Sequence, residues 1–328
     1  MFIKRLLTII LCCSLCFVSA ISFTGCGSEG DGGTQNSGQS SAEQSAENSD
    51  AVPQANSSIK VLEPKATGEV VYTAKNLEVD ASNVSQGYIM LNYSGENQKI
   101  KVQISKANDE QVTYTYNLNA RAAYEVFPLT EGDGTYSISV FENISGSKYS
   151  QLFHQDVEVN LDNEHLPFLY PNQYVNFSKD SKLLAKGAEI TKGLAEDIQK
   201  VEAVYNFAVE TFSYDYDKAE TVPSGYLPDV DQVLADKKGI CFDYAAVMAS
   251  MLRSQNIPCK LVVGYTGDIY HAWINVYTAD TGWIDGMIFF DGAEWQLMDP
   301  TFASTGKKSQ DIMEYISNPA NYKAKYVY

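Results

Sequence analysis

The sequence predicts an α+β protein in which an all-β region precedes a region that combines helices and strands. Residues 61–162 alternate apolar and polar side chains in short segments between turn residues, without helical periodicity. Residues 163–328 instead begin with apolar stripes at helical spacing and continue with alternating segments. The 328 residues are 45% hydrophobic, which is enough for two packed domains.

Residues 1–25 are predicted to be a lipoprotein signal peptide. Lys4 and Arg5 precede an apolar run that ends at residues 23–26, Phe-Thr-Gly-Cys. This ending resembles a bacterial lipobox, whose cysteine is lipidated and becomes the first residue of the mature chain. We therefore expect a lipid on Cys26 to anchor the protein to the cell membrane, outside the cytoplasm. An uncleaved membrane helix is the alternative, and it gives the same location.

Residues 26–60 are predicted to be a flexible, low-complexity tether. They are rich in Ser, Gly, Gln, Asn and Glu and have too few aliphatic residues to form a core. The whole chain has 41 acidic and 24 basic residues, so its net charge is −17. Because such a charge repels nucleic acid, we exclude nucleic-acid binding.

Residues 61–162 are predicted to form a β-sandwich. The expected strands are 70–74, 86–93, 99–106, 112–118, 122–128, 134–142 and 149–161. Tyr136, Ile138 and Val140 alternate with serines, which indicates a strand with one buried face. About seven strands in about 100 residues, with no helix, are typical of an immunoglobulin-like sandwich. His154 falls on one of these strands, where we interpret it as a structural or surface residue.

The second region, 163–328, is predicted to contain several helices. The expected segments are 181–190, an amphipathic stripe from Leu194 to Phe212, 230–237, and a helix from Cys241 to about residue 255. In the last of these, Cys241, Ala245, Met248 and Leu252 share one face. Cys241 would then lie in the first helical turn, where unpaired backbone N–H groups and the helix dipole favour the thiolate.

A nucleophilic cysteine needs a base, and histidine suits this role at neutral pH. His271 lies in the alternating segment 270–277, which would place it on one face of a strand with Trp273 and leave the apolar residues toward the core. A carboxylate can orient such a histidine. Asp299 is placed for this, because it follows a predicted hairpin with an Asp-Gly turn at 291–292.

Each of these residues alone is more often structural than catalytic. A disulfide between Cys241 and Cys259 is the alternative use of these two cysteines, which are the ones in the predicted folded regions. The joint occurrence of a cysteine at a helix start with a histidine and an aspartate on strands favours catalysis instead.

Five short segments also carry a resemblance to a known family. They are 239–245 (Gly-Ile-Cys-Phe-Asp-Tyr-Ala), 257–258 (Ile-Pro), 263–265 (Val-Gly-Tyr), 271–273 (His-Ala-Trp) and 299–301 (Asp-Pro-Thr). Together they resemble the transglutaminase-like superfamily, a branch of the papain-like cysteine enzymes. The resemblance implies a helix packed on an antiparallel sheet, with Cys241 as nucleophile, His271 as general base and acid, and Asp299 as the orienting carboxylate.

Three features remain open beside this resemblance. Family members supply an oxyanion donor from a side chain upstream of the cysteine, and either Tyr214 or Tyr216 could do so here. Trp273 could form a wall of the substrate cleft or simply pack. Residues 283–292 are longer than the family hairpin, and they either line a cleft or fill a local core.

No metal or other cofactor is expected. Histidines and cysteines are too few to bind zinc, and Asp215, Asp217 and Glu220 lack the pattern of a calcium loop.

The sequence therefore predicts a thiol enzyme that acts on amide or peptide bonds of a peptide or protein substrate of the cell envelope. Hydrolysis is favoured by analogy, and a crosslinking transglutaminase is the alternative. A non-catalytic adhesion or assembly lipoprotein is the second alternative.

Overall fold

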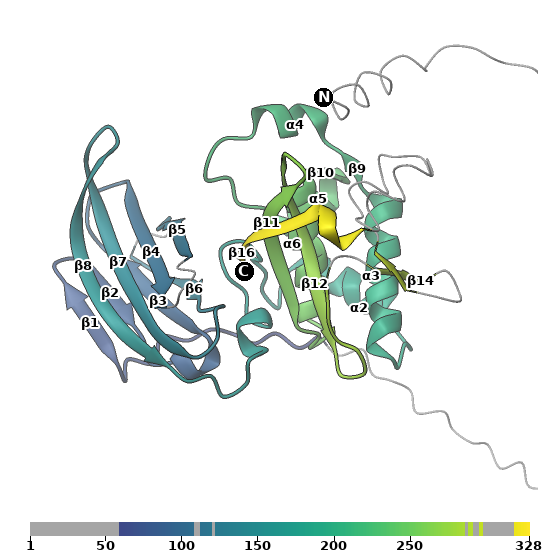
Figure 1. The fold of residues 1–328 in the computed structure, drawn as a ribbon, viewed down its shortest axis with the longest axis horizontal. Helices are drawn as coiled ribbons and strands as arrows, with labels where there is room; N and C mark the ends of the chain where they lie inside the picture. Colours follow the sequence, from purple (N-terminus) through teal and green to yellow (C-terminus); the bar gives the residue numbers. More distant parts are fainter. Residues whose placement is uncertain (1–58, 108–111, 120–121, 286–287, 291–294, 298–317) are drawn as a thin grey trace, which may run out of the picture. The chain divides into compact units, whose positions relative to one another are not determined.

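The computed structural model describes residues 59–107, 112–119, 122–285, 288–290, 295–297 and 318–328 (Figure 1). These residues belong to one compact unit of mixed α/β structure. The predicted signal peptide, most of the tether, Cys26 and Asp299 lie outside the described residues. Within the described ranges, none of the helices combines the length and the apolar character needed to cross a membrane.

Two four-stranded antiparallel sheets occupy the first part of the described chain. One has the order β1-β2-β3-β6, built from β1 (Val71–Ala74), β2 (Leu77–Asp80), β3 (Tyr88–Tyr93) and β6 (Tyr124–Pro128). The other has the order β5-β4-β7-β8, built from β4 (Ile100–Lys106), β5 (Thr113–Asn117), β7 (Gly134–Ser145) and β8 (Lys148–Val159). A short 3₁₀ helix, η1 (Val84–Gln86), precedes β3. Each predicted segment overlaps one of these strands, but β7 runs three residues past the predicted end at 142 and β8 begins one residue before the predicted start at 149.

The alternation predicted along β7 is confirmed, because Tyr136, Ile138 and Val140 are all buried. The strand β2 was not predicted. It pairs with β1 through a tight turn in which Lys75 adopts a positive φ of 51°. Two-residue hairpin turns are usually recognised in a sequence by glycine or asparagine at the position with positive φ. A lysine at that position gives no such signal.

In the described residues, five α-helices follow: α2 (Lys182–Ile190), α3 (Asp197–Thr211), α4 (Tyr216–Thr221), α5 (Val230–Asp236) and α6 (Cys241–Arg253). A 3₁₀ turn, η2 (Leu166–Phe168), precedes them. The stripe predicted from Leu194 starts too early, because the Glu196 and Gln199 side chains cap the helix and fix its first turn at Asp197. The helix α4 was not predicted, and Asp215 starts it by accepting a bond from the Lys218 N–H at 2.9 Å.

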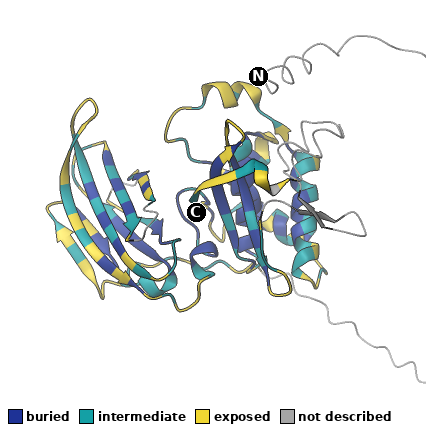
Figure 2. Cartoon of the chain, viewed as in Figure 1, coloured by how far each residue is buried: buried dark blue, intermediate teal, exposed yellow. Residues whose placement is uncertain are grey.

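The helix α6 is buried along most of its length (Figure 2). A single buried face was predicted, but residues 243–253 are all buried. The reason is that α6 packs against β11 (Cys259–Thr266) and β12 (Ile269–Thr278) and also against α2, α3 and α5. A helix enclosed in this way is apolar around most of its circumference, and its buried polar side chains, Asp243, Ser250 and Arg253, have hydrogen-bond partners.

The sheet beside α6 has the strand order β13-β12-β11-β16. Its outer strands are β13 (Gly282–Ile284) and β16 (Tyr322–Val327), and η3 (Pro319–Asn321) precedes β16. Two short strands, β9 (Ser213–Tyr214) and β10 (Lys238–Gly239), pair in parallel just before α6. The predicted hairpin is present as β14 (Ile288–Phe290) and β15 (Trp295–Leu297). The all-antiparallel sheet and the buried helix agree with the predicted α+β region.

Gly264 allows β16 to lie close to β11. A Cβ at this position would lie 2.0 Å from the Lys323 carbonyl oxygen and 2.9 Å from the Trp273 ring. Because one of these neighbours is backbone, relief requires the strands to separate. We expect Gly264→Ala to lower the free energy of unfolding by about 1–3 kcal/mol, as overpacking does. Urea denaturation measures this loss, and an unchanged midpoint would contradict the close approach.

Candidate active site

Cys241 is the accessible one of the two cysteines in the described residues. It is the first residue of α6 and is partly exposed, whereas Cys259 on β11 is fully buried. Both thiols are free, so the alternative of a disulfide between them is wrong. Burial raises the pKa of Cys259 to about 12, which leaves it as an inert thiol at neutral pH.

His271 lies on β12, one of the two strands that pack against α6. Tyr270, the residue before it, is close enough to Cys241 for the two to interact electrostatically. Burial, and to a smaller degree its neighbours Tyr326, Tyr265 and Cys241, raise the pKa of Tyr270. The thiol of Cys241 therefore lies near Tyr270, and a direct contact between Cys241 and His271 stays a prediction.

The alternation predicted along β12 holds only in part. Ala272, Ile274 and Val276 belong to the core, as predicted. His271 and Trp273 are also buried, with 4% and 6% of their surface exposed. The reason is that the rings of His271 and Trp273 stack with centroids 6.3 Å apart, and Tyr322 on β16 packs against the Trp273 indole at 5.4 Å.

The third predicted residue, Asp299, lies outside the described residues, so its place beside His271 stays a prediction. Trp273 is positioned by packing against His271 and Tyr322, and a role as cleft wall also stays a prediction. His154 is a surface residue, as predicted, and its ring makes a 2.9 Å hydrogen bond with the Ser139 hydroxyl.

The two predicted oxyanion donors occupy different environments. Tyr214 is half-buried on β9, and its partner in the parallel pairing with β10 is Gly239, two residues before Cys241. Tyr216 begins α4 and is 57% exposed. Their rings contact each other with centroids 5.0 Å apart. The β9–β10 pairing holds the backbone of Tyr214 close to Gly239, just before Cys241. The backbone of Tyr216 has no place in this pairing.

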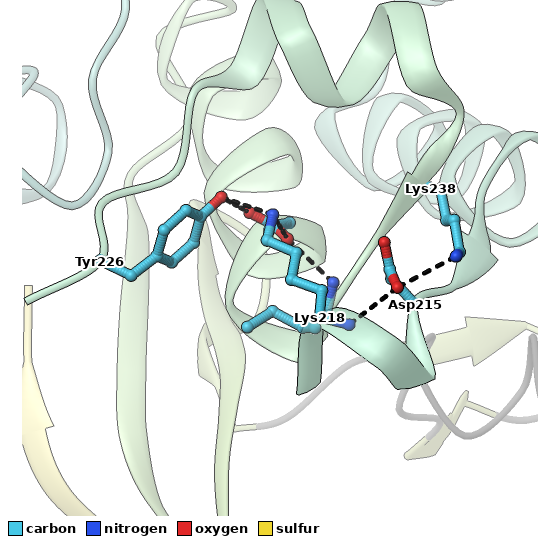
Figure 3. Close-up of polar contacts among 6 residues, drawn as sticks. Asp215, Lys218, Tyr226 and Lys238 are labelled. Atoms are coloured by element: carbon cyan, nitrogen blue, oxygen red, sulfur yellow. Dashed lines mark hydrogen bonds and ion pairs between the residues drawn. The ribbon is translucent and has the colours of Figure 1, made fainter. Parts of the chain in front are cut away.

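A buried polar cluster lies under the first turn of α6 and was not predicted (Figure 3). Asp243 is fully buried, and its carboxylate accepts hydrogen bonds from Lys218 Nζ at 2.6 Å and from the Tyr226 hydroxyl at 2.5 Å. It also accepts a bond from the Ile240 backbone N–H at 2.9 Å. Lys218 Nζ further donates to the Tyr226 hydroxyl at 2.6 Å. The carboxylate at the third position of α6 thus fixes the residue that precedes Cys241.

This cluster explains the glycine that opens the 239–245 segment. The Asp243 side chain folds back over Gly239, and a Cβ on that glycine would lie 2.7 Å from the Asp243 Cβ. Asp243, two residues after the cysteine, was the available signal in the sequence. Its partners Lys218 and Tyr226 are 25 and 17 residues away along the chain, so no local spacing indicates them.

Trp283, at the start of the predicted insertion 283–292, packs locally. Its ring makes edge contacts with Phe168 at 5.3 Å and with Tyr277 at 5.5 Å, and Lys260 Nζ lies 3.7 Å from the ring centroid. These contacts favour the interpretation that this part of the insertion fills a core. In the part of the chain that the structure describes, no group of three or more His, Cys, Asp or Glu could hold a metal ion.

Residues 185–300 match the model of the transglutaminase-like superfamily. This region contains α3 to α6, β11 to β15 and both Cys241 and His271. An uncharacterized protein of Bacillus subtilis, YebA, is 32% identical over an alignment of 105 positions that covers 26% of this chain and 14% of that protein. A protein-glutamine gamma-glutamyltransferase of Pseudomonas aeruginosa is 23% identical over 44% of this chain and 23% of that protein. The matches thus span less than a quarter of either relative.

Solved structures that match this chain include a Cytophaga hutchinsonii protein named as a candidate cysteine protease, with 15% identity and a TM-score of 0.35 over 74% of this chain and 83% of that one. Red sea bream transglutaminase has 12% identity and a TM-score of 0.27 over 72% of this chain and 54% of that one.

Proposed function

Since residues 185–300 form a transglutaminase-like domain, we propose that the chain is a thiol enzyme that transfers acyl groups from amide or peptide bonds. The observation that carries this proposal is Cys241, a partly exposed thiol at the start of a buried helix, near Tyr270, the residue before His271 on β12. The helix start favours the thiolate that such chemistry requires.

In the proposed reaction, the Cys241 sulfur attacks the carbonyl carbon of an amide and forms a tetrahedral intermediate. The backbone N–H of Cys241 and the side chain of Tyr214 or Tyr216 would stabilise the oxyanion. His271 accepts the thiol proton and gives it to the leaving amine or ammonia, and a thioester remains on Cys241. Asp299 would orient the His271 ring. Water or an amine then attacks the thioester, with His271 as the base.

We favour water as the acceptor, which makes the chain a peptidase or amidase. The alternative is transfer to an amine, and the P. aeruginosa relative, whose printed name is that of a glutamine gamma-glutamyltransferase, supports it. The proposed substrates are peptides or proteins of the cell envelope, and the proposed location is outside the cytoplasm with a lipid on Cys26. The sequence pattern of residues 1–26 supports this location.

We further propose that the two sheets between β1 and β8 form an immunoglobulin-like sandwich. In that fold, strands A, B and E are neighbours in one sheet and strands C, F and G in the other. The runs β2-β3-β6 and β4-β7-β8 have these orders when β2 is taken as strand A. Such a module supports the alternative that part of the chain serves in binding or adhesion.

The reaction can be tested with the full chain and peptides that contain glutamine and lysine. Samples quenched in acid are analysed by mass spectrometry for an acyl adduct on Cys241, and the products are analysed for new carboxylates or new isopeptide bonds. We expect the adduct and, in water, carboxylates; added hydroxylamine should convert the thioester to a hydroxamate.

Alkylation with iodoacetamide provides the control. Cys259 is buried, so among the described cysteines the reagent should modify Cys241 alone in the folded chain. Products that persist after Cys241 is blocked would contradict the proposed function. Isopeptide bonds in place of carboxylates would identify a crosslinking enzyme instead of a hydrolase.

A further inference from the structure

The polar cluster under α6 links a lysine from another helix to the turn that carries the thiol. We propose that Lys218 is a positioning residue for the chemistry of Cys241. It neutralises the buried Asp243 carboxylate, and the start of α6 can then favour a thiolate at Cys241. This inference rests on the proposed function, because it concerns the reactivity of the same thiol.

The Asp243 carboxylate requires a cationic partner. Its side chain is fully buried, and an isolated charge is costly to remove from water. Hydrogen bonds from the Ile240 N–H and the Tyr226 hydroxyl stabilise the charged form but leave its charge in place. Lys218, whose side chain is 26% exposed, supplies the compensating charge at 2.6 Å.

The position of Asp243 makes its charge matter for Cys241. The two residues lie in the same helical turn, and an uncompensated carboxylate there would oppose the negative charge of a thiolate. It would also cancel the favourable field of the helix start. The pair of Asp243 and Lys218 has no net charge. Asp243 can therefore accept the capping hydrogen bond from the Ile240 N–H without placing an uncompensated negative charge beside the thiolate.

Tyr226 completes the pair without adding a charge. Its hydroxyl donates to Asp243 and accepts from Lys218, and Lys218 Nζ lies 4.3 Å from the centroid of its ring. Burial, and next the hydrogen bond to the Asp243 carboxylate, raise the pKa of Tyr226 well above its ordinary value. The hydroxyl therefore stays protonated under all conditions in which the thiol is tested.

Other titratable groups near this cluster come from further elements. They are His271 and Tyr270 on β12, Asp215 at the start of α4, Lys238 on β10, and Asp229 at the start of α5, whose charge acts on Tyr226. Lys238 Nζ lies 3.0 Å from the Asp215 carboxylate, so these two charges also compensate each other (Figure 3). The backbone N–H of Asp215 donates to the Gly239 carbonyl, which ties the segment that carries Lys218 to the segment before Cys241.

The test is the pH dependence of Cys241 alkylation by iodoacetamide in the full chain, read by mass spectrometry. We expect Lys218→Met to raise the midpoint of this profile by about one pH unit, which lowers the alkylation rate at pH 7 about tenfold. Lys218→Arg keeps the charge and should retain the wild-type midpoint. Lys200→Met is the matched control, since Lys200 is similarly buried and pairs with Asp197 on α3 at 2.9 Å.

The double variant Lys218→Met with Asp243→Asn separates charge from structure. It removes both charges, so its midpoint should return toward that of the wild type, whereas a merely structural role predicts a larger change than in Lys218→Met. Thermal melting shows whether each variant is folded.

Two results would overturn the inference. One is a Lys218→Met alkylation profile equal to that of the wild type, and the other is a double variant whose midpoint does not return toward the wild-type value. A wild-type midpoint near pH 8.5, as for an ordinary thiol, would instead contradict the proposed function itself.

Discussion

A full-length chain with His271→Ala is expected to turn over its substrate about 10²–10⁴-fold more slowly than the wild type, as the loss of a general acid and base does. Cys241→Ala is expected to remove turnover altogether, because no other accessible thiol lies among the described residues. Both effects follow from the proposed thioester, which forms at Cys241 and requires proton transfer through His271.

The reactivity of the thiol provides a measurement that does not depend on the substrate. The proposed function requires a thiolate at Cys241 that the protonated His271 ring stabilises, so the rate of Cys241 alkylation should depend on His271. In His271→Ala, the imidazolium is absent, and the alkylation profile should move toward that of an ordinary thiol.

His154→Ala is the matched control, since this histidine is exposed and bonds only to surface groups of β7 and β8 in the described structure. A His271→Ala chain with an unchanged rate and an unchanged alkylation profile would show that His271 is structural. The function would then have to be sought in binding.

The helix that begins at Cys241 could be predicted because its signals are local. The Gly239 turn and the spacing of Cys241, Ala245, Met248 and Leu252 lie within 14 residues of one another. The strand alternations of β7 and β12 are local for the same reason, and they led to His271. Local periodicity is set by the backbone geometry of one element, so it needs no knowledge of the neighbours.

The environment of the thiol could not be predicted in the same way. Lys218 and Tyr226 are distant from Asp243 in the sequence, and the tertiary fold brings them into contact with it. Lys218 also lies on α4, a short helix that was not predicted and whose N-cap is Asp215. The burial of His271 likewise depends on Trp273 and on β16, which begins 51 residues after His271. Contacts of this kind depend on which surfaces the fold brings together, and no single spacing in the sequence encodes them.

Arg253, the last residue of α6, illustrates how strongly such contacts can act. It is fully buried, and its guanidinium donates to the carbonyl oxygens of Cys259, Tyr170 and Tyr328 at 2.6–3.0 Å. Arg253 therefore joins α6 to β11, to the residues that follow η2 and to the residue that follows β16. Burial lowers the pKa of Arg253 to about 10, so the side chain is charged at neutral pH.

We expect Arg253→Met to lower the free energy of unfolding by about 3–5 kcal/mol, because the carbonyl groups of Cys259, Tyr170 and Tyr328 lose the bonds from the guanidinium, and Tyr328 keeps the bond from the Leu261 N–H. Arg253→Lys keeps the charge but not the planar set of donors, and it should recover only part of this loss. Lys186→Met is the control, since its pair with Glu189 is largely exposed and should contribute less than about 1 kcal/mol.

Urea denaturation of the three variants measures these differences. If Arg253→Met proved as stable as Lys186→Met, the buried guanidinium would be replaceable by apolar packing, as some buried charges are. The expected order of stability is Lys186→Met, then Arg253→Lys, then Arg253→Met. That order would show that the hydrogen bonds donated by the buried Arg253 contribute more to stability than an exposed ion pair does, beside the apolar packing that encloses α6.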